Sequence, residues 1–162
     1  MENIATTIDA IGCKLVSDIL RKFGSARLHL KGSSMLPSLL PGDILIVRQQ
    51  PLSQLATGDI VVFARNGHLI THCIVGKSCE GIRYLFTRGD SCEKPDAPIS
   101  SHELLGRVTN IMRGRRQFAP QEITILSRLL SFLFRKSNGA TILFLSLLRR
   151  IHRLREGTRC QA

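Results

Sequence analysis

Residues 32–43 read GSSMLPSLLPGD and lie between two apolar, strand-like runs. Pro37 fixes its own φ and favours an extended backbone at Leu36, so no helix is expected to continue through the stretch. Pro41-Gly42-Asp43 then has the composition of a turn. A serine on such a rigid, exposed elbow is well placed to be a nucleophile, and Ser34 is our candidate. An inert surface serine is the alternative, because serine-rich turns are common.

The apolar pattern around this elbow predicts a mainly β chain that begins with a helix. Near the N-terminus an apolar residue recurs every three or four positions, which predicts one amphipathic helix packed on the domain by that face. The apolar stripe consists of Ile4, Ile8, Ile11, Leu15, Ile19 and Phe23. From residue 26 to about residue 117, short apolar runs alternate with turn signals such as Asn66-Gly67, a strong hairpin signal. This pattern predicts a compact antiparallel coiled sheet rather than a βαβ fold.

The last third of the chain changes character and predicts a C-terminal helical hairpin. Residues 123–134 and 140–155 are apolar segments punctuated by arginine. We therefore divide the chain into an N-terminal amphipathic helix (1–25), a β domain (26–117) and a basic, apolar extension (118–162). No run of 18 apolar residues occurs in the sequence, so a standard membrane-spanning helix is not expected.

The positive charge of the chain is concentrated in the same extension. The net charge is +11, and residues 113–162 contain 11 Lys or Arg and 2 acidic residues. Because an apolar stripe runs beside clustered arginines, we predict membrane association through residues 123–155 at an anionic surface. Packing of the hairpin on the β core, in a cytoplasmic protein, is the alternative. No secretory signal is visible, so we do not expect a secreted protein.

The aromatic residues and the cysteines of the chain each argue against particular kinds of binding site. The chain has no Trp and one Tyr, which disfavours a platform for stacked bases and makes nucleic acid an unexpected partner. Its five cysteines are odd in number and form no CxxC, so reduced thiols are expected rather than a disulfide framework or a zinc knuckle. We predict neither a metal nor a cofactor.

A serine hydroxyl is a poor nucleophile until a base takes its proton. His72 is the leading candidate base because it lies inside the apolar run 69–75, and His29, on the strand before the elbow, is its rival. A third group should orient the imidazole and stabilise its charged form, and Asp90 and Asp96 in a polar loop are the candidates. The structural alternative for His72 is a buried core histidine whose hydrogen bonds are satisfied. For Asp90 and Asp96 it is a turn in which aspartate side chains cap backbone groups.

Several short blocks occur in a fixed order along the β region. They are GSSMLPSLLPGD (32–43), TGDIVVF (57–63), THCIV (71–75), TRGDSCEKPD (87–96) and LGRV (105–108). Together, over about residues 28–112, they resemble the type I signal peptidase family. More narrowly they resemble its endoplasmic-reticulum type, in which a histidine stands where bacterial members have a lysine.

The resemblance implies a serine endopeptidase with a compact, mostly antiparallel β fold. It assigns Ser34 as the nucleophile, His72 as the general base and Asp96 as the acid that completes the site. Asp90 and Met35 would support these three residues. The family cuts signal- or leader-type peptides after small residues and binds them as an added strand, a mode in which main-chain hydrogen bonds supply affinity.

The resemblance also indicates how the oxyanion would be stabilised. Gly32 lies where bacterial relatives place a serine hydroxyl, so the oxyanion hole would rest mainly on backbone N–H, that of Ser34 in particular. Two other function classes remain open. One is a peptide-binding module of the same fold with little activity. The other is a basic, nucleic-acid-associated protein of the LexA kind, which shares the fold but uses a lysine base.

Overall fold

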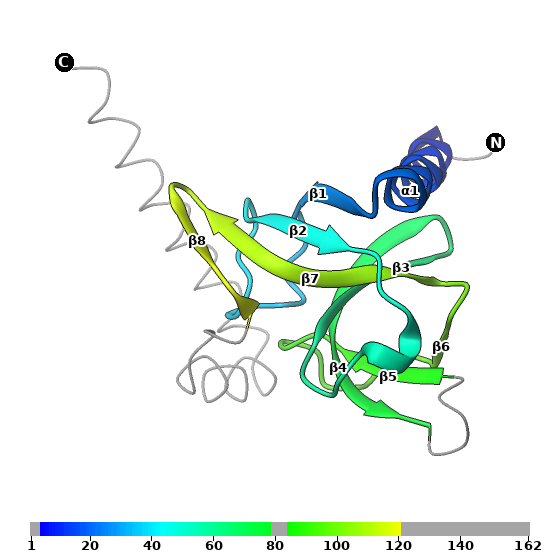
Figure 1. Ribbon diagram of the computed structural model, residues 1–162, viewed down its shortest axis with the longest axis vertical. Coiled ribbons are helices and arrows are strands. Elements are labelled where there is room, and N and C mark those ends of the chain that lie inside the picture. The colour runs from blue at the N-terminus through cyan, green and yellow to red at the C-terminus, as the bar shows by residue number, and fades with distance from the viewer. Residues whose placement is uncertain (1–3, 79–83, 121–162) are drawn as a thin grey trace.

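The computed structural model describes residues 4–78 and 84–120 of the chain, and its strands form one antiparallel sheet of eight strands (Figure 1). The elements are α1 (Ile4–Phe23), β1 (Ser25–His29), β2 (Ile44–Arg48), a 3-10 turn η1 (Leu52–Gln54), β3 (Ile60–Arg65), β4 (His68–Lys77), β5 (Tyr84–Arg88), β6 (Ile99–Ser100), β7 (Leu104–Arg113) and β8 (Arg116–Phe118). The strand order is β1-β2-β7-β3-β4-β5-β6, with β8 paired to β7. The mainly β prediction is confirmed, and the predicted helices in residues 123–155 lie outside the described residues.

The predicted strands and the predicted hairpin both occur in the structure. The apolar runs of the sequence lie in β2, β3, β4, β5 and β7. Asn66 and Gly67 join β3 to β4 with φ angles of 52° and 77°, a two-residue turn whose twist suits paired strands. The sequence does not predict β6 and β8, because two or three residues are too few to show an alternating pattern.

Both faces of strand β3 are buried, which places this strand at the centre of the molecule. Successive side chains of a strand point to opposite faces of its sheet. Ile60 and Val62 pack into an apolar cluster beneath α1 and the elbow, together with residues of β2 and β7. Val61 and Phe63 pack into a second cluster with residues of η1, β4, β5 and β6. The coiled sheet thus encloses two small cores, and β3 carries the strand β4 that contributes His72.

Helix α1 forms as predicted but packs through a different face. From residue 11 onward, where its side chains are described, three members of the predicted stripe are exposed. These are Ile11, Leu15 and Phe23, at 59% to 67%. The docked face instead contains Cys13 and Leu20, which are 8% and 1% exposed. The prediction of the buried face was therefore wrong: Leu20 enters the core, and the Cys13 thiol donates a hydrogen bond of 3.1 Å to the Gly67 carbonyl.

The helix ends where the sequence indicates. Gly24 has a φ of +69°, a left-handed conformation that glycine adopts easily, and its N–H donates to the Leu20 carbonyl at 2.8 Å. The chain then turns directly into β1. No helix within residues 4–78 and 84–120 is long and apolar enough to cross a membrane.

The elbow of residues 32–43 is attached to β7 by a buried carboxylate. Asp43 is 2% exposed and receives two hydrogen bonds from Arg113, at 2.8 and 2.7 Å. The same carboxylate accepts the Leu40 N–H, and Arg113 also donates to the Ser38 carbonyl. A buried carboxylate requires such partners, so this ion pair fixes the end of the elbow to the sheet.

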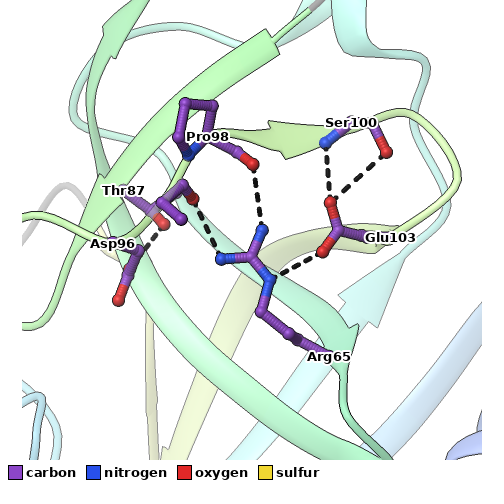
Figure 2. Close-up of polar contacts among 7 residues, drawn as sticks. Arg65, Thr87, Asp96, Pro98, Ser100 and Glu103 are labelled. Atoms are coloured by element: carbon purple, nitrogen blue, oxygen red, sulfur yellow. Dashed lines mark hydrogen bonds and ion pairs between the residues drawn. The ribbon is translucent and has the colours of Figure 1, made fainter.

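A second ion pair holds the loop between β5 and β6 against the end of β3. Arg65 donates to Glu103 at 2.6 Å and to the carbonyls of Ala97 and Pro98 at 2.9 and 3.0 Å. Figure 2 shows its contacts with Glu103 and Pro98. Glu103 in turn accepts hydrogen bonds from the backbone N–H and the hydroxyl of Ser100. The hydrogen bond from Arg65 is the main cause that lowers the pKa of Glu103 below its ordinary value of 4.5.

This ion pair predicts a pH-dependent contribution to stability. Because the folded chain holds the Glu103 proton less tightly than the unfolded chain, the stabilisation is present above pH 4.5 and is lost as the pH falls through the lowered pKa. We expect Glu103→Gln to reduce the free energy of unfolding at pH 7 by less than about 1 kcal/mol, since the pair is partly exposed. The difference from wild type should shrink in acid.

Urea unfolding at a series of pH values measures this effect. Glu93→Gln is the matched control, because Glu93 is exposed, and it should change the free energy of unfolding little at any pH. A deficit in Glu103→Gln that stays constant down to pH 3 would contradict the assignment.

Candidate active site

Three segments far apart in the sequence meet at one point of the sheet. Ser34 lies on the elbow after β1, His72 lies in β4, and Asp96 lies in the loop between β5 and β6. Ser34 Oγ is 3.0 Å from His72 Nε2, and His72 Nδ1 is 2.6 Å from Asp96 Oδ2. Because a carboxylate can only accept, Nδ1 carries the proton and Nε2 is left to accept one from the serine. The arrangement is that of a serine, histidine and acid triad.

The other sequence candidates occupy different places. The two ring nitrogens of His72 contact Asp96 and Ser34, which are the acid and the serine that the sequence analysis favoured. His29 is exposed on β1. Met35 is 1% exposed and lies in the core beneath the elbow, where its carbonyl accepts the Leu39 N–H at 2.9 Å. Met35 thus anchors the elbow and does not line the site.

The sequence analysis did not identify Thr87, which orients the acid. This side chain is fully buried in β5, and its hydroxyl donates to Asp96 Oδ2 at 2.6 Å. The Asp96 N–H returns a hydrogen bond of 2.8 Å to the Thr87 carbonyl. The Phe63 ring packs edge-on against the imidazole of His72, with ring centres 6.2 Å apart. The His72 ring and the Asp96 carboxylate are therefore held by packing as well as by hydrogen bonds. The only sequence signal for Thr87 was its place at the start of the block TRGDSCEKPD.

Ser91 is a second residue that the sequence analysis did not identify, and it holds the elbow. Its hydroxyl donates to the carbonyls of Ser33 and Ser34, at 3.1 and 2.9 Å, and its backbone N–H also reaches the Ser34 carbonyl at 2.9 Å. The Ser34 carbonyl is therefore fixed by two donors from one residue. This contact orients the serine backbone relative to the loop that carries Asp96.

Gly89 is required because three groups of the site crowd its α-carbon. A β-carbon there would lie 2.6 Å from the Ser34 carbonyl oxygen, 2.8 Å from Cys92 Sγ and 2.9 Å from His72 Nε2. Such distances are too short for a methyl group, so any other residue would displace Ser34 or His72. Burial, and then the nearby Asp96 carboxylate, raise the pKa of the Cys92 thiol. Cys92 therefore contributes a neutral group beside the imidazole.

Arg65 stabilises the loop immediately after the acid. Its guanidinium donates to the Ala97 and Pro98 carbonyls, the two that follow Asp96 in the chain, and Figure 2 shows the contact with Pro98. The hydrogen bond to Glu103 is the main cause that raises the pKa of Arg65 further, so this anchor stays charged. Arg65 thus acts on the triad through the backbone and does not touch the imidazole.

The Ser34 hydroxyl and the His72 ring line one end of a groove of about 700 Å³. Residues 28–32 form one side of this groove, residues 67–72 form the other, and α1 contributes residues at the end near the hairpin. Among the described residues, most of the lining side chains are aliphatic and none is a carboxylate. The volume is typical of a binding cleft rather than of a packing defect. Within residues 4–78 and 84–120, no three His, Cys, Asp or Glu residues converge as metal ligands would.

Comparison with known protein families identified a match to one family. The family described as Peptidase S24-like matches residues 7–109, a region that contains the elbow, the groove and all three residues of the triad. A search of curated proteins returned no matching relative. This family belongs to the superfamily of LexA and the signal peptidases, and its LexA-like members pair the serine with a lysine. On the extent of this match, which is well over half of its length, the chain belongs to the Peptidase S24-like family of serine peptidase folds.

Proposed function

We propose that this protein is a serine endopeptidase in which Ser34 is the nucleophile, His72 the general base and Asp96 the residue that orients the base. The observation that carries the proposal is the continuous series of hydrogen bonds from Ser34 Oγ through the imidazole to Asp96, opening into a groove. A buried histidine with a purely structural role would not require a contact between its ring nitrogen and a serine hydroxyl that lines a groove. The family match supports the same reaction class.

The chemistry follows from the positions of these groups. His72 Nε2 accepts the hydroxyl proton while Ser34 Oγ bonds the scissile carbonyl carbon, and the carbonyl oxygen takes up the negative charge. The backbone N–H of Ser34 would stabilise that oxyanion, a role worth roughly a hundredfold in rate or more. The imidazolium then protonates the leaving amine as the C–N bond breaks. Water, deprotonated by the same imidazole, releases the acyl group from Ser34.

An extended peptide is the substrate that the groove best accommodates. β1 is the last strand at one end of the sheet, and β5 pairs with β4 only from Cys73 onward. Within the described residues, the β1 edge and residues 68–72 of β4 are therefore not covered by another strand. Both segments line the groove, so a peptide placed between them could add a strand to the sheet and present its backbone to Ser34.

The proposed substrate class is a signal- or leader-type peptide, which is short and extended before it is cut. The blocks that resemble the endoplasmic-reticulum type of signal peptidase support this class, because that type uses a histidine base. A peptide-binding module without activity would keep the groove but would not react with an acylating probe at Ser34. If the chain instead cuts its own backbone in this assay, the substrate is a segment of the same chain and not a leader peptide.

We further propose that residues 123–155 hold the protein at an anionic membrane surface. The support is the sequence alone, with its apolar stripe and its arginines. The groove would then lie close to the bilayer from which leader peptides emerge.

The first test concerns the nucleophile. Ser34→Ala should lower kcat/KM for peptide cleavage by roughly a thousandfold or more while leaving the unfolding temperature nearly unchanged. Ser33→Ala is the matched control, because Ser33 contributes its carbonyl rather than its hydroxyl to the contacts of the elbow, and it should cost less than about threefold. Mass spectrometry of a fluorophosphonate adduct gives an independent readout. An adduct on Ser33, with cleavage surviving in Ser34→Ala, would overturn the assignment.

The second test concerns the base. An imidazole must be neutral to accept a proton, so cleavage should decline as the pH falls and the imidazole becomes protonated. A lysine base would place this decline at more alkaline pH. His72→Ala should abolish activity, and Asp96→Asn should cost about 10²- to 10⁴-fold, more than Asp90→Asn. Activity retained in His72→Ala and lost in His29→Ala would show that the wrong histidine had been chosen.

The third test concerns the membrane surface. The full chain should sediment with anionic vesicles and not with neutral ones, and binding should weaken with salt, because each basic residue near the surface contributes roughly 1 kcal/mol. A variant with four arginines of the extension changed to glutamine should bind less; these are Arg149, Arg150, Arg153 and Arg155. The control removes the same charge from exposed positions of the β domain, Arg27, Arg48, Arg115 and Arg116. Equal losses in both variants would indicate general charge attraction and would reject a specific role for the extension.

A further inference from the structure

Helix α1 forms one wall of the groove that contains Ser34. Gly12, Leu15 and Val16 of α1 all line this groove, at the end formed by the β3–β4 hairpin. Leu15 is 59% exposed although it is a leucine, and Leu69 on β4 lines the same groove and is 39% exposed. Two large aliphatic side chains therefore remain partly uncovered where the groove meets the helix.

Gly12 is unusual for its place in the helix. It lies well inside α1, where glycine is less favourable than alanine. Its φ is not in the left-handed region, and a β-carbon at this position would meet no atom within 4 Å. Neither backbone conformation nor close packing therefore requires a glycine here. The absence of a side chain leaves open space on the wall of the groove.

The wall is firmly placed relative to the triad. The Cys13 thiol bonds the Gly67 carbonyl in the hairpin, and the fully buried Leu20 fixes the helix on the core. In Figure 1, α1 lies beside the end of the β3–β4 hairpin. From His68, at that end of the groove, to His72 the strand advances about 13 Å, at about 3.3 Å per residue. A peptide extended along β4 would cover this length with three or four residues.

We infer that Gly12, Leu15 and Leu69 form a specificity subsite for a bulky aliphatic or aromatic side chain of the peptide, three or four residues from the bond that is cut. This inference rests on the proposed function, because it assumes that the groove holds a peptide. The substrate side chain would cover the exposed leucines, and the missing side chain of Gly12 provides its space. The lining residues that the structure describes include no carboxylate, so among them the subsite offers no partner for lysine or arginine at this position.

Peptide selection by full-length variants tests the subsite. A library of peptides from a digested proteome is incubated with the wild type, and the cut bonds are read by mass spectrometry. The same library is captured on the Ser34→Ala chain, which measures binding without cleavage. The wild type should prefer Leu, Ile or Phe over Ala three or four residues from the cut bond. Gly12→Leu, which fills the space, should reduce that preference at least tenfold in both assays and leave neighbouring positions unchanged.

Two further variants separate the subsite from the stability of the helix. Asp18→Leu introduces the same side chain at an exposed position of α1 that does not line the groove, and it should leave the preference intact. Leu15→Ala removes part of the wall without touching the core and should weaken the preference at least threefold. If Gly12→Leu loses all cleavage and capture, the Leu15→Ala result decides: a weakened preference supports the subsite, and an unchanged one overturns it.

The outcomes also distinguish this inference from the proposed function. Cleavage by the wild type with a preference that both Gly12→Leu and Leu15→Ala leave unchanged overturns the subsite and keeps the peptidase. Capture with the expected preference, but no cleavage by the wild type, keeps the subsite and rejects the peptidase. Absence of both capture and cleavage overturns both.

Discussion

The close approach of three segments at Gly89 is the constraint on which the site depends. The Ser34 carbonyl, the His72 ring and the Cys92 thiol all come within 3 Å of the place that a β-carbon of residue 89 would occupy, at 2.6, 2.9 and 2.8 Å. Only a residue without a side chain allows this contact. Because Gly89 lies directly before the loop that carries Asp96, its contact also sets the distance between the acid and the base.

Each of the three segments is separately attached to the sheet. The ion pair between the buried Asp43 and Arg113 fixes the end of the elbow, and Arg65 holds the carbonyls after Asp96. His72 needs no such clamp, because β4 pairs with β3 along its length. Each of these attachments fixes a loop to a strand residue, Arg113 of β7 or Arg65 of β3, and strands hold a site more precisely than loops do. Polar ion pairs thus position the site, while the two apolar clusters position the strands.

Local patterns in the sequence predicted the strands and the three residues that meet, but not the contacts that hold them. Ser34 and His72 were identifiable because an elbow with two prolines and a histidine in an apolar run are local features. Thr87 and Ser91 act through hydrogen bonds to segments distant in the sequence, which no local pattern reveals. The docked face of α1 was predicted wrongly because both faces carry apolar residues. The hairpin that receives Cys13 decides between them.

Under the proposed function, the position of Asp96 favours histidine over lysine as the base. LexA-like members of the family use a lysine. A carboxylate favours the charged form of a neighbouring amine, so an acid 2.6 Å from the base would keep a lysine protonated and unable to accept the serine proton. An imidazole avoids this conflict because it has two nitrogens: one donates to the carboxylate while the other accepts from the serine. Thr87, fully buried and bonded to the same carboxylate oxygen, fixes the acid on the far side of the ring from Ser34. The acid and its threonine are therefore consistent with a histidine base and would oppose a lysine base.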